Sequence, residues 1–262
     1  MTGISDSEPS NFDEASRQQV WREAMVEEYA SIMQNDVWEI VPRPEGKSVV
    51  TSRWLYKVKY AADDSVEKFQ TRFVTRGFSQ IEGVDYGETF APVAQYTSIR
   101  SVIASAAEMG WKIHQTDVKT LFLHGVIDDE VYIQQPQGFE VHGVDFHVCR
   151  LKKALYGLKQ APRACYSRMD TYLQQIGFEK IEADPNLYHI VVDGELLVHV
   201  LYDDHLFITR ALNLIERCKR DLASEYEMKD IGLMHYFLGL EVWQEKGHIF
   251  QGQGKYAVDV LT

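Results

Sequence analysis

Three apolar runs follow one another between residues 187 and 209, and a short acidic turn separates each run from the next. The first turn is Asp-Gly, a dipeptide that favours a two-residue hairpin. The second turn holds Asp203 and Asp204, directly before His205. Strands joined by such short connections pair as antiparallel neighbours, since a parallel pair needs a long crossover. The sequence therefore predicts an antiparallel sheet in this half of the chain.

Helices and further strand pairs alternate along the rest of the chain. Apolar residues recur at helical spacing, whereas other runs have the alternation of strands or the apolar content of buried ones. Helices and hairpin strands in mixed order indicate an α+β fold and not a doubly wound parallel sheet. Helices are predicted at 21–34, 99–106, 166–176 and 215–222, and strands at 37–41, 53–59, 69–78, 111–118, 130–135, 235–242 and 247–251.

Helix ends carry their own signals. Ser10 or Asn11 is predicted to cap a short helix after a disordered segment, residues 1–9. Thr97 or Ser98 is predicted to cap a helix that Gly110 ends.

Composition limits the class of protein. A chain of 262 residues, 45% of them hydrophobic, can bury a large core in one mixed domain or two subdomains. No apolar run approaches the roughly 20 residues of a membrane span, and the N-terminus lacks the pattern of a signal peptide. The three cysteines are far apart in the sequence, without C-x-x-C spacing, so we expect reduced thiols. We therefore expect an intracellular protein, cytoplasmic or nuclear, with no membrane partner.

The net charge of −12 argues against a nucleic-acid partner, but its distribution is uneven. Residues 1–40 hold nine acidic and two basic side chains, whereas residues 148–168 hold six basic and no acidic ones. The basic stretch is compatible with phosphate binding, although such a stretch by itself is more often a solvated helix face.

Asp117 ends one predicted strand, and the Asp203-Asp204 pair lies between two others. If these strands are neighbours, the carboxylates converge and repel unless a cation neutralises them. A hard divalent ion with oxygen ligands does so, and two such ions support phosphoryl transfer. The alternative is a solvated hairpin turn, which is the ordinary reason for an Asp-Asp pair.

Several ordered blocks carry a family resemblance. They are W-R-E-A-M-V-E-E; R-F-V-T-R-G-F-S-Q with G-V-D-Y-G-E-T-F-A-P-V-A; T-D-V-K-T-L-F-L-H-G; L-K-K-A-L-Y-G-L-K-Q-A-P-R; and E-M-K-D-I-G with Y-F-L-G-L-E-V. In these blocks the chain resembles the reverse transcriptase of copia-type LTR retrotransposons, over nearly its full length from about Glu8. An unrelated carboxylate-metal nuclease is a much weaker alternative, because the ordered blocks fit one family.

The resemblance implies a right-hand polymerase fold with an antiparallel palm sheet and β-rich fingers, the thumb being largely absent from this chain. It implies addition of dNTPs to a primer on an RNA or DNA template, with two Mg²⁺ ions, or Mn²⁺, as cofactors. No protease, integrase or RNase H segment is expected here. The implied domain is 10–262, with fingers at about 20–105 and 126–158, palm at about 106–125 and 159–242, and the primer-support hairpin and thumb start at 236–262.

Site residues are implied position by position. Asp117, Asp203 and Asp204 match the catalytic, metal-binding carboxylates, and Val118 would add a backbone carbonyl. Phe122 falls where the family places an aromatic that blocks a 2′-hydroxyl, although core packing would also explain it. Arg72, Gln160 and Lys229 join Phe122 as implied nucleotide-binding residues, and Pro162, Arg163, Phe237, Leu238 and Gly239 as implied template or primer contacts.

The acidic tip departs from the family pattern, which is Tyr-Val-Asp-Asp before an apolar strand. Aligned without a gap, Asp203 replaces the valine, Asp204 is the main metal-binding carboxylate and His205 replaces the second one. Aligned with a slip, Asp203 and Asp204 are the pair and His205 is an extra residue at the strand start. A one-residue slip turns every side chain to the other face. The flanks have family length, so the ungapped alignment is the one we predict.

Impaired activity follows from the ungapped alignment, because imidazole is a poor ligand for Mg²⁺. Other departures point the same way: Gln70 stands at a usual lysine, Leu121 at a small alanine and Cys165 at a tryptophan. Two hypotheses result. The chain is an RNA-directed DNA polymerase domain with reduced activity, or it is an inactive retroelement remnant that at most binds nucleic acid.

Overall fold

The computed structural model describes residues 8–60, 65–144, 146–202, 205–245 and 247–261. It divides into two compact units. Met1–Ala91 and Phe122–Arg168 form the first unit, and Pro92–Leu121 and Met169–Thr262 form the second. The sequence left open one mixed domain or two subdomains, and the chain forms two such units.

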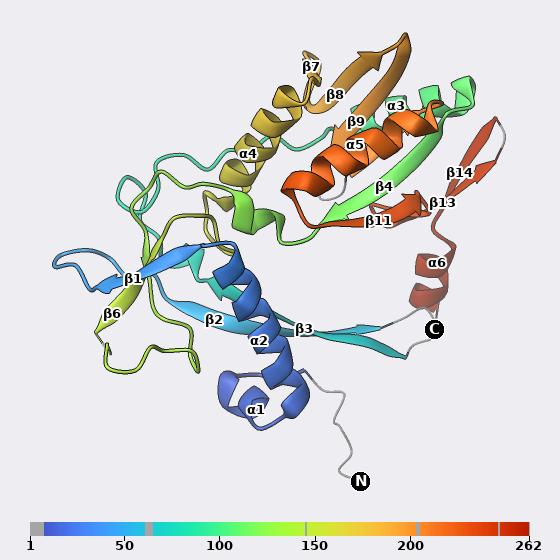
Figure 1. Cartoon of the computed structure of the whole chain (residues 1–262). Helices are drawn as coiled ribbons and strands as arrows, with labels where there is room; N and C mark the ends of the chain where they lie inside the picture. Colours follow the sequence, from blue (N-terminus) through green and yellow to red (C-terminus); the bar gives the residue numbers. More distant parts are fainter. Residues whose placement is uncertain (1–7, 61–64, 145, 203–204, 246, 262) are drawn as a thin grey trace. The chain divides into compact units, whose positions relative to one another are not determined.

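The first unit contains small antiparallel sheets and N-terminal helices (Figure 1). One sheet is a ribbon of β2 (Ser52–Tyr60) and β3 (Val66–Thr75). The other has the order β1-β6-β5, from β1 (Trp38–Pro42), β6 (His147–Leu151) and β5 (Tyr132–Ile133). The helices are α1 (Phe12–Ser16), α2 (Gln19–Gln34) and the short η1 (Gly77–Ser79).

Alternation along β2 builds the core of the first unit. Trp54, Tyr56 and Val58 are buried, whereas the residues between them are exposed, as the sequence pattern predicts. Helix α2 covers the buried face through Trp21, whose ring lies 5.0 Å from that of Phe69 on β3. Most side chains on the outer face of the ribbon are basic or polar, among them Arg53, Lys57 and Lys59.

The second unit is built on a six-stranded antiparallel sheet with the order β11-β4-β10-β9-β8-β7 (Figure 1). Two of its pairings, β8 with β9 and β9 with β10, confirm the antiparallel arrangement predicted for residues 187–209. The strands are β4 (Lys112–Val118), β7 (Glu179–Ile181), β8 (Asp184–Val192), β9 (Glu195–Leu201), β10 (His205–Thr209) and β11 (Met228–Leu233).

A small sheet and several helices complete the second unit. The small sheet has the order β12-β13-β14, from β12 (Tyr236–Phe237), β13 (Leu240–Glu245) and β14 (His248–Gly252). The helices are α3 (Tyr96–Met109), α5 (Leu212–Glu225) and α6 (Gly254–Leu261). Helix α4 (Ala161–Gln175) and η2 (Leu121–His124) each have residues in both units.

The two faces of the large sheet are both buried, with different side chains. Ile113, Leu206 and Ile208 pack on one face in a core that includes residues of α3. His205 and Phe207 alternate with them and therefore lie on the opposite face, also fully buried. Asp117, four residues after Ile113 on β4, shares the first of these faces.

Most predicted elements are present, but one helix cap is wrong, and a turn at Leu238 and Gly239 divides the strand predicted at 235–242. Asn11 caps α1, since its side chain accepts a hydrogen bond from the Glu14 amide at 2.9 Å. Helix α3 ends at Gly110 as predicted, but it begins after Gln95, which provides no side-chain cap, and not after Thr97 or Ser98.

Several sequence expectations concern what the chain lacks. The three cysteines are free and buried. Among the described residues, no helix combines the length and the apolar character needed to cross a bilayer. Residues 1–7 of the predicted disordered segment lie outside the described residues, whereas Glu8 accepts a hydrogen bond from the Val58 amide at 3.1 Å.

Candidate active site

Asp117 lies near the end of β4, a central strand of the second unit. Its direct neighbour on β11 is Lys229, and paired residues on adjacent strands share a face. The predicted carboxylate and the predicted lysine are therefore brought together. Asp117 is half-buried, and its carboxylate has no hydrogen-bond or ion-pair partner within the described part of the chain. Val118 points to the other face and is buried.

The first residue of β10 lies at the same end of β4 as Asp117. Strand β10 begins at His205, which is paired with Thr116, next to Asp117. The predicted carboxylates Asp203 and Asp204 precede His205 and lie outside the described residues. Within those residues no group of three or more metal-binding side chains is found.

His205 lies on the opposite face of the sheet from Asp117, because it is paired with Thr116. Its ring is fully buried, with Nδ1 3.0 Å from Nε2 of His199, which is also fully buried. Burial lowers the pKa of His205 to about 4 and that of His199 well below its usual value. The two rings therefore form a neutral, hydrogen-bonded pair in the core.

The hairpin predicted to support the primer is formed by β12 and β13. Leu238 and Gly239 make its turn, both with positive φ, as a tight two-residue hairpin requires. Phe237 is buried, and its ring centroid lies 6.0 Å from that of Tyr202. Tyr202 immediately precedes Asp203, so this hairpin contacts the residue that leads into the acidic tip.

Two predicted nucleotide-binding residues of the first unit, Arg72 and Phe122, both lie against the ring of Tyr156. The Arg72 guanidinium carbon lies 5.2 Å from the centroid of the Tyr156 ring. The Phe122 ring lies 5.0 Å from the same ring, centroid to centroid. The sequence analysis missed Tyr156; its place in the basic stretch, four residues before Gln160, was the available signal.

Arg72 is also paired with a carboxylate that the sequence analysis missed. Its Nη1 lies 2.8 Å from Oε2 of Glu28, whose side chain is only 3% exposed. The second oxygen of Glu28 accepts a hydrogen bond from the Phe73 amide at 3.4 Å. Burial raises the pKa of Glu28, and the guanidinium and the amide oppose that rise.

Gln160 is buried in a hydrogen-bond network of the first unit. Its Nε2 donates to the Asp85 carbonyl at 3.0 Å and to Asp129 Oδ2 at 3.1 Å, and its Oε1 accepts from Gln80 at 3.0 Å. The following Pro162 and Arg163 are exposed in the first turn of α4.

Gln160→Ala is expected to lower the free energy of unfolding by about 1–2 kcal/mol, because it leaves buried partners without their hydrogen bonds. Urea unfolding of the purified chain measures this. Gln134→Ala, in the same unit but at an exposed position, is the control and should unfold like the wild type. Equal stability of the two variants would contradict the structural role of this network.

The other departures occupy different environments. Gln70 is half-buried on the outer face of the ribbon, opposite Lys57. Leu121 is half-buried at the start of η2. Cys165 is buried in α4, and burial raises the pKa of its thiol to about 12, so it is not a reactive thiolate.

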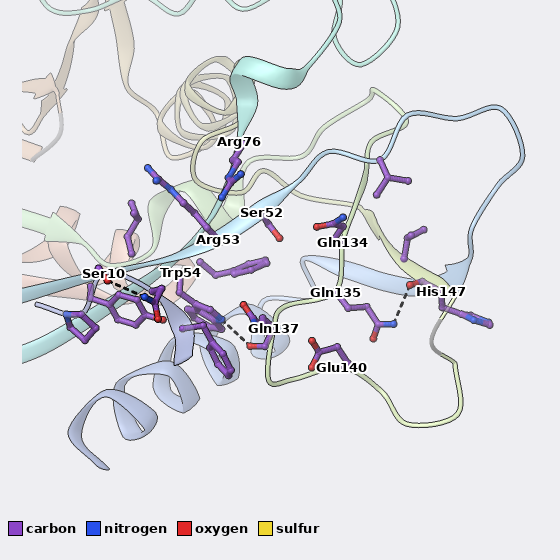
Figure 2. A pocket seen from close by; sticks show the side chains of 18 of the residues that line it. Ser10, Ser52, Arg53, Trp54, Arg76, Gln134, Gln135, Gln137, Glu140 and His147 are labelled. Atoms are coloured by element: carbon purple, nitrogen blue, oxygen red, sulfur yellow. Dashed lines mark hydrogen bonds between the residues drawn. The ribbon is translucent and has the colours of Figure 1, made fainter. Parts of the chain in front are cut away.

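An open pocket of about 970 Å³ lies elsewhere in the first unit (Figure 2). None of the predicted site residues lines it. Arg43, Arg53 and Arg76 line it without an ion-pair partner in the described residues, and Ser52 and Gln134 add polar groups. Arg53 and Arg76 extend to the same side in Figure 2.

Comparison with known proteins identifies the family. The model of the family described as "Reverse transcriptase (RNA-dependent DNA polymerase)" matches residues 35–262. The chain is 36% identical over 264 aligned positions to the retrovirus-related Pol polyprotein from transposon TNT 1-94 of Nicotiana tabacum, covering 98% of this chain and 20% of the polyprotein.

A second relative gives the same result. The retrovirus-related Pol polyprotein from transposon RE1 of Arabidopsis thaliana is 38% identical over 260 positions, covering 98% of this chain and 18% of that protein. The chain thus spans about a fifth of the length of these relatives. It belongs to the reverse transcriptase family, in the copia-type group found in transposon Pol polyproteins.

Proposed function

We propose that the chain is the RNA-directed DNA polymerase domain of a retrotransposon polyprotein. The first unit takes the role of the fingers and the second that of the palm. The substrates are dNTPs and a primer annealed to an RNA or DNA template. The observation that carries the proposal is the position of Asp117, at the end of β4 where β10 begins and opposite Lys229.

Asp117, Asp203 and Asp204 are the proposed metal-binding residues, with the Val118 carbonyl as a further ligand. The donor set fits Mg²⁺, because it consists of oxygens and the Asp117 carboxylate has no other partner in the described chain. When bound, two such ions supply activation of the attacking 3′-hydroxyl and stabilisation of the leaving pyrophosphate. Lys229 places a positive charge on the same face, beside the leaving group.

His205 is buried against His199 on the face opposite Asp117, so it is not a ligand of an ion held by Asp117. We therefore take the slipped alignment of the tip. In the slipped alignment Asp203 and Asp204 remain the carboxylate pair. His205 then departs from the family in the core, where His199 is its partner.

The remaining roles follow the family positions. Arg72 contacts the triphosphate, and Phe122 excludes the 2′-hydroxyl. Gln160 supports the nucleotide site from within its buried network. Pro162 and Arg163 contact the template, and the hairpin at Phe237, Leu238 and Gly239 supports the primer.

Reduced activity remains part of the proposal. Gln70 removes a cation from the ribbon face that carries Arg72, and Leu121 adds bulk directly before Phe122. The second candidate, an inactive remnant that binds nucleic acid, is supported by the same ribbon, since Arg53, Lys57 and Lys59 are exposed there.

Primer extension on poly(rA)-oligo(dT) with dTTP tests the proposal, with Mg²⁺ and Mn²⁺ in separate reactions. We expect metal-dependent extension that a chelator abolishes. Retention of the template-primer in a filter-binding assay, without extension under either metal, would favour the inactive remnant. Absence of both binding and extension would contradict the polymerase and leave an inactive remnant with no binding role.

A further inference from the structure

Glu28 lies on α2, far along the chain from every residue assigned above. Its side chain is 3% exposed, and such a buried carboxylate is stable only with good partners. The partners are the Arg72 guanidinium and the Phe73 amide. Both belong to β3, so the carboxylate is fixed against the strand that carries Arg72.

Helix α2 is itself held firmly against β3. The Thr71 hydroxyl donates to the Ala24 carbonyl at 2.9 Å, one turn before Glu28. The Trp21 ring meets the Phe69 ring edge-on. These contacts fix the position of Glu28. Its ion pair with Arg72 therefore restricts the position of the guanidinium.

Tyr156 constrains the guanidinium from another direction. A guanidinium over an aromatic ring gains a cation–π attraction and a preferred separation from the ring. The Tyr156 backbone is fixed as well, since its carbonyl accepts hydrogen bonds from the amide and the hydroxyl of Thr75 on β3. A Cβ on the next residue, Gly157, would lie 2.1 Å from the Thr75 carbonyl oxygen, so the two segments pack closely.

We propose that Glu28 and Tyr156 are positioning residues of the nucleotide site, which hold Arg72 in the orientation that receives the triphosphate of the incoming dNTP. Tyr156 also supports Phe122, so the phosphate contact and the sugar contact share one aromatic support. The inference rests on the proposed function, because it takes Arg72 and Phe122 as nucleotide contacts.

Removal of the Glu28 charge has two opposed effects on dNTP binding. Arg72 becomes a stronger cation for phosphate, a gain of at most about fivefold at a partly exposed site. It also becomes mobile, and immobilising a free arginine side chain reduces an affinity by up to about thirtyfold. The second effect is larger, so we expect weaker binding.

A double-mutant cycle tests the inference. Glu28→Gln is expected to raise the KM for dTTP about tenfold with a smaller change in kcat, and to have no such effect when Arg72 is already alanine. A structural role alone would give equal effects in both backgrounds. The matched control is Glu27→Gln, which removes an exposed partner of Lys68 on the same helix and strand and should leave KM unchanged.

Tyr156 is tested by a conservative pair. Tyr156→Phe keeps the ring and should retain the wild-type KM, whereas Tyr156→Leu should raise it about tenfold and increase the use of rTTP, because Phe122 loses its support. Equal KM values for the phenylalanine and leucine variants would overturn this role.

A binding readout separates this inference from the proposed function. The same cycle is measured by calorimetric titration of Mg·dTTP into the purified chain. Coupling between Glu28 and Arg72 in the Kd, without primer extension by the wild type, would keep the inference and reject polymerisation. Primer extension by the wild type, with additive effects of the two substitutions on the Kd, would keep the proposed function and reject the inference. Absence of both extension and dTTP binding would reject both.

Discussion

Asp117→Asn is expected to reduce primer extension about a thousandfold, because a metal ligand supplies several kcal/mol of transition-state stabilisation. The substitution preserves the shape of the side chain and removes its charge. The fold should tolerate it, since the carboxylate is half-buried and bonded to nothing in the described chain. We expect the midpoint of thermal unfolding to change little, as for most substitutions outside a bonding network.

The control for Asp117→Asn is Asp193→Asn, which removes the same charge at the exposed turn between β8 and β9. Asp193 has a φ of 52°, a conformation that asparagine also tolerates. It should fold and extend the primer as the wild type does. Wild-type extension by Asp117→Asn would mean that the metal centre does not involve β4, and the proposed palm would have to be abandoned.

Asp117 and Lys229 show which site positions could be predicted from the sequence. Both were placed by resemblance, and the register of β4 with β11 sets them directly opposite each other. The antiparallel order of residues 187–209 also followed from the pattern, because short turns leave no other pairing. Local signals are sufficient where neighbouring segments pair with each other.

Glu28 and Tyr156 could not be found in the same way. Glu28 lies 44 residues before Arg72, and the contact depends on the packing of α2 on β3. A glutamate in an acidic N-terminal helix looks like a solvated charge in the sequence. Only tertiary packing shows that it is buried, and the same holds for Gln160, whose network joins three distant segments.

His205 occupies an environment that the sequence did not predict. The alternation of strand β10 places it with Phe207 and Thr209, away from Asp117. The sequence analysis read it as a failed metal ligand because flank lengths favoured an ungapped alignment. Its hydrogen bond to His199 gives each buried ring one partner, which removal of either histidine would take from the other.

His205→Asp is expected to lower the free energy of unfolding by about 3 kcal/mol, because it buries a carboxylate and removes the partner of His199. His199→Val combined with His205→Met removes both polar groups and should be nearly neutral. Urea unfolding followed by circular dichroism measures the three chains. A His205→Asp variant as stable as the wild type would contradict the buried position of this residue.

Two further variants decide the register of the acidic tip. Asp203→Val with His205→Asp restores the family pattern if the ungapped alignment holds, whereas a valine inserted between Tyr202 and Asp203 restores it if the slipped one does. We expect the insertion to extend the primer at least as well as the wild type. The double substitution should lose stability and extend poorly, because its new carboxylate faces away from Asp117. Faster extension by the double substitution would establish the ungapped alignment and the impairment that follows from it.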